Sequence, residues 1–218
     1  MFPIECAPTR RSFLRSAALF STAASGLALL PQNGVSADSE ENIIGPRPGY
    51  SPEIGTLVSM MTWMRGTVLS SVKGLTENDL DHLIDDKANS IGSLLLHLAA
   101  TDRIYQINTF AGNPLKELPE SYKEKWGAAM ELGDAARKTI KGHDLAYYLN
   151  LLAEVREQTL AEFRKRDDNW LMTVDKTWGW GPTNNYCKWF HVCEHESNHN
   201  GQIKFLAKRL PGAKPGRE

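Results

Sequence analysis

The segment HVCEHESNHNGQ, residues 191–202, places three histidines at intervals of four residues: His191, His195 and His199. Each residue of an α-helix turns the chain by about 100°, so a step of four returns almost to the same side. The three rings would therefore share one stripe of a helix. Histidine pairs at this spacing occur in helical zinc sites, and neutral imidazole also suits Fe, Ni and Cu. The segment predicts a helix with a metal-binding face.

Apolar residues recur with a helical period in four long segments of the chain. The predicted helices cover residues 53–72, 91–112, 145–166 and 184–210. Ser90 and Asp144 precede the second and third helices as N-cap residues, and Thr76 with Asp79 forms a capping-box pattern for a shorter helical turn. Strand-type alternation is almost absent. The sequence therefore predicts an all-α fold, a four-helix bundle.

Two connections between these helices contain aromatic residues, glycine and proline. Residues 112–142 predict a long connection between the second and third helices, in which 128–140 could form one or two short helices. Long connections in small domains are often functional. In residues 170–182, Trp178 and Trp180 flank a glycine. They either pack as a lid or form the wall of a pocket.

A metal site inside a bundle needs a ligand from a facing helix, and His97 is the histidine of the second predicted helix. Its stripe of the helix is semi-polar and contains Ser90, Ser93, Thr101, Ile104 and Asn108. Such a stripe indicates a wet pocket rather than a dry core. A lone interior histidine is more often a hydrogen-bonded core residue, so His97 is a candidate ligand because of the pattern on the last helix. His82 and His143 are expected to be ordinary surface residues.

Two segments resemble the signature regions of the DinB/YfiT-like metalloprotein superfamily. They are ANSIGSLLLHLAATDRIYQ, residues 88–106, and WFHVCEHESNHNGQI, residues 189–203. The resemblance implies a four-helix bundle domain over residues 53–212, with the long connection between helices two and three. Characterised members of the superfamily include thiol-dependent transferases and isomerases that use bacillithiol, mycothiol or glutathione.

The resemblance also implies a metal site. One histidine of the second helix and an H-x3-H pair of the last helix match His97, His195 and His199, which would hold a divalent Zn, Ni, Fe or Mn ion. Three protein ligands leave an open coordination position, as in catalytic zinc sites. His191 is assigned to a position next to the ligands, without binding the metal itself. In the alternative assignment, His191 and His195 bind the metal in place of His195 and His199.

Two classes of function follow from this site. The first is a metal-dependent hydrolase or thiol/group transferase acting on a small molecule. The second is a non-catalytic metal-binding or partner-binding bundle in which the metal serves stability and His191 is a fourth ligand. No general base is evident, because Glu194 and Glu196 are expected to face solvent or a neighbouring helix.

Charge argues against nucleic acid as a partner. The chain has 25 basic and 26 acidic residues and a formal net charge of −1, without the basic surplus that phosphate binding requires. A homodimer is a weaker expectation, based on the resemblance.

The N-terminal residues have the pattern of an export signal. The twin-arginine segment TRRSFLR (9–15) precedes the apolar residues 16–30, and a Val-x-Ala motif ends at Ala37. A membrane anchor is the alternative, but the apolar run is shorter than the ~20 residues of a spanning helix. We expect cleavage after Ala37, a periplasmic or otherwise exported protein, a flexible arm over 38–52 and a tail over 213–218. Export weakens the thiol-transferase reading, because low-molecular-weight thiols are chiefly cytoplasmic.

Overall fold

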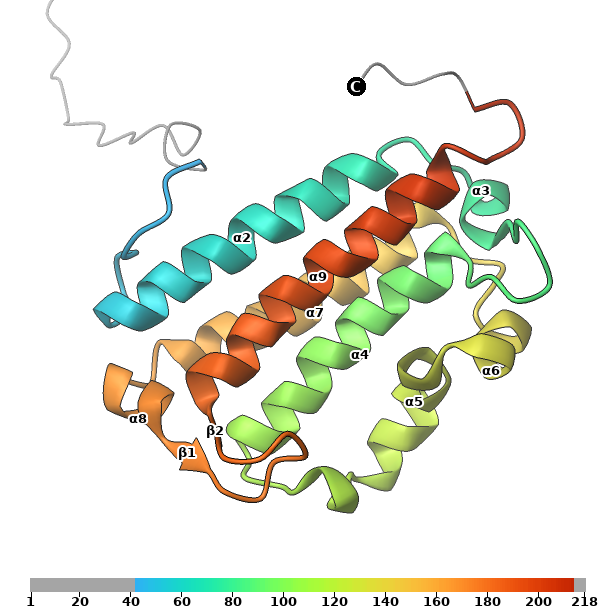
Figure 1. Ribbon diagram of the computed structural model, residues 1–218. Coiled ribbons are helices and arrows are strands. Elements are labelled where there is room, and N and C mark those ends of the chain that lie inside the picture. The colour runs from blue at the N-terminus through green and yellow to red at the C-terminus, as the bar shows by residue number, and fades with distance from the viewer. Residues whose placement is uncertain (1–41, 214–218) are drawn as a thin grey trace, which may run out of the picture. The chain divides into compact units, whose positions relative to one another are not determined.

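The computed structural model describes residues 42–213, and the four predicted long helices are present in it (Figure 1). They are α2 (Pro52–Val72), α4 (Ile91–Thr109), α7 (Leu145–Phe163) and α9 (Asn185–Ala207). The shorter elements are α3 (Glu77–Asp81), η2 (Leu115–Glu117), α5 (Glu120–Glu131), α6 (Gly133–Thr139), α8 (Asp168–Met172), β1 (Val174–Asp175) and β2 (Thr183–Asn184). The predicted all-α bundle is thus confirmed.

Some predictions concern residues at the two ends of the chain. The predicted signal, residues 1–37, lies outside the described residues, as do 38–41 of the arm and 214–218 of the tail. Residues 42–51 lie against α2, where Gly45 donates its N–H to Ser59 and the Trp63 indole N–H donates to Asn42. Within 42–213, no helix combines the length and the apolar character needed to cross a membrane.

Polar side chains begin the helices where the sequence predicts them. Ser90 accepts the backbone N–H of Ser93 at 3.1 Å, and Asp144 accepts that of Tyr147 at 2.9 Å. The capping box of Thr76 and Asp79 also forms. Each cap satisfies an amide that the first helical turn leaves without a backbone partner.

The last helix begins within one residue of its predicted start, directly after a short antiparallel pair. Val174 pairs with Asn184, and Asp175 pairs with Thr183. Asn184 then caps α9 by accepting the backbone N–H of Cys187 at 2.8 Å. The expectation that no sheet forms is therefore wrong at this one place, where strands of two residues are too short to produce a periodic pattern.

The long connection follows from the directions of the helices. Asp102 contacts Arg156 and Gln106 contacts Thr159, so α4 and α7 run parallel. The chain must therefore return along the length of α4 before α7 can begin. Figure 1 shows α9 between α2 and α4, with α7 behind them and α5 and α6 beside α4.

Residues 112–142 contain more helix than the sequence led us to expect. The helix α5 covers residues predicted mainly as a loop, and α6 follows it. The buried residues of α5, Tyr122, Trp126 and Ala129, are spaced by four and three, which is the spacing of an amphipathic helix. The sequence contains this spacing, but the charged residues between these positions made the helical pattern hard to recognise.

The interior contains two apolar clusters separated by charged residues. One cluster includes Leu94, Tyr148 and Ile203, and the other includes Leu57 and Trp189. Between them lie four buried charged side chains, one from each long helix: Arg65, Asp102, Arg156 and Glu196.

A close contact between α4 and α7 depends on a glycine. A Cβ atom at Gly92 would lie 2.6 Å from the Tyr148 hydroxyl oxygen and 2.8 Å from its Cζ atom. The Tyr148 ring is fully buried and has little room to move. Because overpacking of this kind typically costs about 1–3 kcal/mol, we expect Gly92→Ala to lower the free energy of unfolding by that amount. Urea denaturation measures the change.

A second glycine supplies the control for this prediction. Gly127 lies inside α5, and a Cβ atom there meets nothing within 4 Å. Gly127→Ala should be neutral or stabilising by up to about 1 kcal/mol, because alanine favours a helix. Equal stability of the two variants would contradict the close approach of α4 and α7.

Candidate metal centre

Three histidines from two helices meet at the interface of α4 and α9. His97 comes from α4, and His195 and His199 come from α9. One ring nitrogen of each lies within 4.8 Å of those of the other two. The ring centroids of His97 and His199 are 4.7 Å apart, and those of His195 and His199 are 4.4 Å apart. These are the three residues assigned from the sequence as metal ligands, and the geometry allows them to hold one ion.

Hydrogen bonds at Nδ1 leave the Nε2 atoms of His97 and His199 free to bind a cation. His97 Nδ1 lies 2.9 Å from the Ala129 carbonyl oxygen, and His199 Nδ1 lies 3.0 Å from Gln202 Oε1. Oxygens of this kind only accept, so both Nδ1 atoms carry the proton and both Nε2 atoms keep a lone pair. Partners of this type orient metal-binding histidines in many sites. The donor set therefore fits a divalent cation.

The third ring completes the cluster. His195 Nε2 lies 2.8 Å from His97 Nε2 and 3.5 Å from Thr101 Oγ1. Because His97 Nε2 keeps a lone pair, the proton of the neutral His195 ring lies on Nε2 and is donated to His97. Binding of a cation at His195 Nε2 would require that proton to move to Nδ1 of the same ring, and the affinity would fall at pH values low enough to protonate the rings.

Burial keeps the cluster uncharged. Burial and, to a smaller extent, the nearby His199 lower the pKa of His97 to about 4. Burial and the other histidines lower the pKa of His195 to about 3, and burial lowers that of His199. The rings are therefore neutral near pH 7, which is the form that binds a metal.

The semi-polar stripe predicted on α4 faces the histidine stripe of α9. His97, Thr101 and Tyr105 follow one another at intervals of four, and Tyr105 meets His191 with 2.8 Å between its hydroxyl and Nδ1. Farther along, the Lys188 ammonium donates to Asn108 at 2.8 Å. A polar seam thus continues from the histidine cluster along this helix pair.

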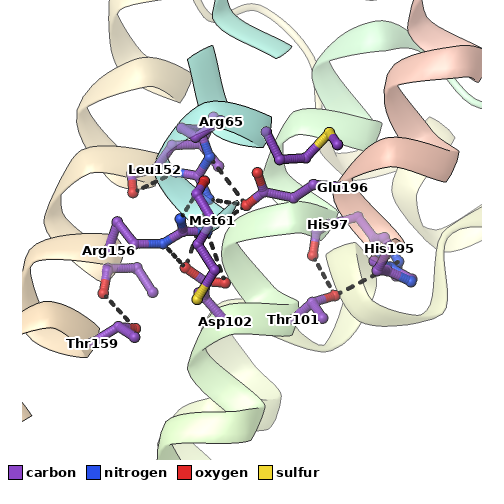
Figure 2. A network of polar contacts seen from close by, with 12 residues as sticks. Met61, Arg65, His97, Thr101, Asp102, Leu152, Arg156, Thr159, His195 and Glu196 are labelled. Carbon is purple, nitrogen blue, oxygen red and sulfur yellow. Dashed lines mark hydrogen bonds and ion pairs between the residues drawn. The ribbon is translucent and has the colours of Figure 1, made fainter. Parts of the chain in front are cut away.

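The buried ionic network lies on the other side of the same two helices, as Figure 2 shows. Arg65 and Arg156 each donate to Glu196 Oε1 at 2.5 Å, and Arg156 Nε donates to Asp102 at 2.9 Å. Glu196 follows His195 directly in the sequence, and Asp102 follows Thr101. The network therefore holds the backbones that carry the histidine cluster.

This network was not predicted from the sequence. Glu194 and Glu196 occupy the two settings expected for them, because Glu194 is exposed and Glu196 is buried against neighbouring helices, but the arginine partners of Glu196 were not identified. A signal was available, because Arg65 and Arg156 lie at buried phases of apolar stripes, between Met61 and Val68 and after Leu152. A charged residue at such a phase indicates a buried partner.

The two tryptophans of the α7–α9 connection have different environments. Trp178 is buried, with the Lys188 ammonium 4.3 Å from its ring, and it borders a pocket of about 450 Å³ with Asn108 and Asp175. Trp180 is 58% exposed, and its ring centroid lies 4.9 Å from that of His191. Of the two roles expected for these tryptophans, Trp178 forms the wall of a pocket, and Trp180 packs against His191.

A second pocket reaches Gln202, the residue that contacts His199 Nδ1. Its volume is about 440 Å³, and its walls are mainly apolar, with Leu94, Phe205 and Leu206. Gln202 connects this pocket to the histidine cluster, although none of the three histidines lines it. His82 and His143 are partly exposed and lie outside the cluster; His143 stacks on Tyr147.

The contact between Gln202 and His199 leads to a prediction about affinity. We expect Gln202→Ala to weaken Zn²⁺ binding by about 10–100-fold, because the His199 ring loses the acceptor that fixes its orientation and tautomer. Titration against a chelator of known affinity measures the change. Ser197→Ala, an exposed change on the same helix, is the control and should leave the affinity unaltered. An equal affinity of the two variants would contradict the orienting role of Gln202.

Comparison with known proteins agrees with this architecture. A family model described as mycothiol-S-transferase matches residues 56–212, which include all four long helices except the first residues of α2. No curated protein is similar enough to the chain to count as a match.

Proposed function

The chain belongs to the mycothiol-S-transferase family, a DinB-like family, and on that premise we propose that it is a metal-dependent transferase joining a small thiol to an electrophilic small molecule. His97, His195 and His199 hold the divalent cation, which is Zn, Ni, Fe or Mn. One observation carries the proposal: ring nitrogens from two helices converge, and the opposite nitrogens of His97 and His199 face acceptors.

Catalytic zinc sites typically have three protein ligands and keep one coordination position open for water or substrate. When bound, such a cation lowers the pKa of a thiol or water and supplies a nucleophile near neutral pH. The protein's part is to hold the rings neutral, to fix their orientation through Ala129 and Gln202, and to place reactants together.

The apolar pocket beside Gln202 is the proposed position of the electrophile. Leu94, Phe205 and Leu206 provide apolar surface there and limit the water that could compete with a thiol. In the reaction the thiol sulfur forms a bond to the electrophilic carbon. The bond from that carbon to its leaving group breaks, the leaving group departs with the electron pair, and the thiol proton passes to solvent.

A hydrolase at the same site is the second candidate, with water in place of the thiol. The non-catalytic alternative predicts full coordination of the metal by the protein, and His191 is the candidate fourth ligand. Its Nδ1 atom, however, is engaged by the Tyr105 hydroxyl, and His191 is not among the three clustered residues. This arrangement supports an open site over a closed one.

The test supplies the metal-loaded protein with monochlorobimane and, separately, mycothiol, bacillithiol, glutathione, cysteine or no thiol. Mass spectrometry identifies the products. A thiol–bimane conjugate formed faster than by the His199→Ala variant supports the transferase, and the choice of thiol follows from the relative rates. Hydrolysed bimane without any thiol would indicate the hydrolase. Rates equal to those of the variant for every thiol and for water would overturn the enzyme proposal.

We also propose that the protein is exported by the twin-arginine route, on the strength of residues 9–37. Because low-molecular-weight thiols are chiefly cytoplasmic, export favours the hydrolase over the transferase, and the comparison of thiols with water in the test above decides between the two. N-terminal sequencing of the protein from a cell envelope fraction should begin at Asp38. Replacing Arg10 and Arg11 by lysine should retain the longer chain in the cytoplasm. An N-terminus before Ala37 in the envelope fraction would contradict cleavage.

A further inference from the structure

His191 continues the stripe of His195 and His199 but is held by a different kind of partner. Its Nδ1 atom lies 2.8 Å from the hydroxyl of Tyr105, a residue only 4% exposed. Tyr105 lies eight residues after His97 on α4, on the stripe that faces the histidines. The pair therefore belongs to the same helix interface as the candidate metal centre.

The Tyr105 hydroxyl determines which nitrogen of His191 carries the proton. Burial raises the pKa of Tyr105 well above its usual value, so the hydroxyl keeps its proton. A buried hydroxyl proton needs an acceptor, and the ring nitrogen of His191 is in hydrogen-bond contact with it. Nδ1 of His191 accepts, so the neutral ring carries its proton on Nε2.

This assignment is opposite to that of two proposed ligands. The partners of Nδ1 in His97 and His199 are oxygen acceptors, so those rings keep a lone pair on Nε2. Because a metal ligand must offer a lone pair, the Nε2–H form of His191 is unsuited to binding the ion. The partner of Nδ1 thus distinguishes the proposed ligand His199 from His191 within one stripe of histidines.

The position of His191 suits a contact with something bound at the cluster. Its ring centroid lies 5.2 Å from that of His195, on the side toward Trp180, and the residue is half-buried. A hydrogen bond from a partly desolvated N–H to an anion is stronger than one between neutral groups. An N–H beside the open side of a metal site is therefore a natural contact for a negatively charged reactant.

We propose that His191 is a non-ligating hydrogen-bond donor that offers Nε2–H to a thiolate or oxyanion bound at the histidine cluster, and that Tyr105 is the positioning residue that selects this tautomer. The inference rests on the proposed function, because the acceptor is the reactant of that site. It distinguishes the roles of four residues along one helix interface: His195 and His199 as ligands, His191 as donor and Tyr105 as its orienting partner.

The first test reads the tautomer directly and needs no substrate. Long-range ¹H–¹⁵N correlation spectra of the Zn²⁺-loaded protein should show His191 protonated at Nε2. In Tyr105→Phe, which removes only the hydroxyl, His191 should become a mixture of tautomers while His97 and His199 keep their pattern. An Nδ1–H tautomer of His191 in the wild type would overturn the inference.

The second test uses the Co²⁺-loaded protein and 2-mercaptoethanol as the thiol probe. His191→Phe, which keeps a ring but has no N–H donor, should retain Co²⁺ affinity and weaken binding of the probe by about tenfold or more, as expected for loss of a hydrogen bond to a charged group. Tyr105→Phe should weaken it by a smaller factor. The visible absorption of the cobalt site reports both equilibria.

The remaining outcomes separate the inference from the function on which it rests. Loss of Co²⁺ from His191→Phe would make His191 a ligand and overturn the donor role. Unchanged probe affinity in His191→Phe would also overturn it, with the metal site intact. If the wild type itself binds no Co²⁺, the metal-dependent function fails and the donor role fails with it, whereas tautomer spectra of the metal-free protein still decide the role of Tyr105.

Discussion

His199→Ala is expected to lose Zn²⁺ affinity by more than 100-fold. The substitution removes one of three clustered nitrogens, and the loss should exceed the 10–100-fold typical of an orienting residue such as Gln202. His97→Ala should have an effect of the same size, although His97 lies on another helix. Chelator competition gives the affinities, and elemental analysis after dialysis gives the metal content.

A matched control for this prediction is His143→Ala. It also removes an imidazole, but from a residue outside the cluster that stacks on Tyr147. Its metal content should equal that of the wild type. Unchanged metal content in His199→Ala or in His97→Ala would remove the site as proposed, whatever the activity of the protein.

Stability provides a second measurement of the same site. A ligand that binds only the folded state raises stability by RT ln(1 + [L]/Kd), which is about 2.7 kcal/mol at a concentration 100 times Kd. Added Zn²⁺ should therefore raise the melting temperature of the wild type and of His143→Ala. It should leave that of His199→Ala almost unchanged. An equal rise in all three would indicate metal binding elsewhere on the chain.

Part of the site was predictable from side-chain periodicity. Intervals of four place His191, His195 and His199 on one face of a helix, and His97 is the histidine of the second long helix. The choice of His195 and His199 as the ligand pair came from the resemblance to the superfamily and not from the spacing. The Ala129 carbonyl that orients His97 could not be found in this way. A backbone carbonyl has no signature in the sequence, and its position depends on how α5 packs on α4.

The ionic network shows a different limit. Local patterns reveal that Arg65 and Arg156 occupy buried phases of their helices, but not that both meet Glu196. That pairing depends on the directions in which the four helices pack against one another, which is a property of the tertiary fold. The parallel direction of α4 and α7 also explains the long connection over residues 112–142. The length of this connection alone, however, did not show that the two helices are parallel.

Arg156→Met is expected to lower the free energy of unfolding by about 3–5 kcal/mol, the cost of removing one partner from a buried ion pair. Arg156 is buried and donates to Asp102, Glu196 and the Met61 carbonyl. Methionine keeps much of the side-chain volume but leaves two buried carboxylates with Arg65 as their remaining cation. Urea denaturation at pH 7 measures the loss.

An exposed ion pair provides the control. Lys165 contacts Glu162 at 2.6 Å, but its side chain is 65% exposed. Lys165→Met should change the free energy of unfolding by less than about 1 kcal/mol, because water and salt screen surface pairs. Equal effects of Lys165→Met and Arg156→Met would mean that the buried network contributes no more than a surface contact.

The pH dependence gives the network an independent signature. Burial by itself raises the pKa of Glu196, but attraction by Arg65 and Arg156 outweighs it and holds the pKa below the ordinary 4.5. A carboxyl whose pKa is lower in the folded state stabilises the protein above the unfolded-state pKa, and this stabilisation is lost as pH falls through the folded value. Wild-type stability should therefore decline below about pH 4.5, and Glu196→Gln should weaken that decline while lowering stability at pH 7.

Residues of the ionic network and of the histidine cluster are neighbours in α4 and α9. A substitution that disturbs the network should therefore also weaken metal binding by the histidines. Glu196 follows His195, and Asp102 follows Thr101 on the helix that carries His97. If the network fixes the register of α4 against α9, folded Arg156→Met should bind Zn²⁺ more weakly although Arg156 touches none of the three histidines. The affinity is measured in conditions where circular dichroism shows the variant to be folded. Wild-type affinity in that folded variant would show that the histidine cluster is held by apolar packing and by its own hydrogen bonds alone.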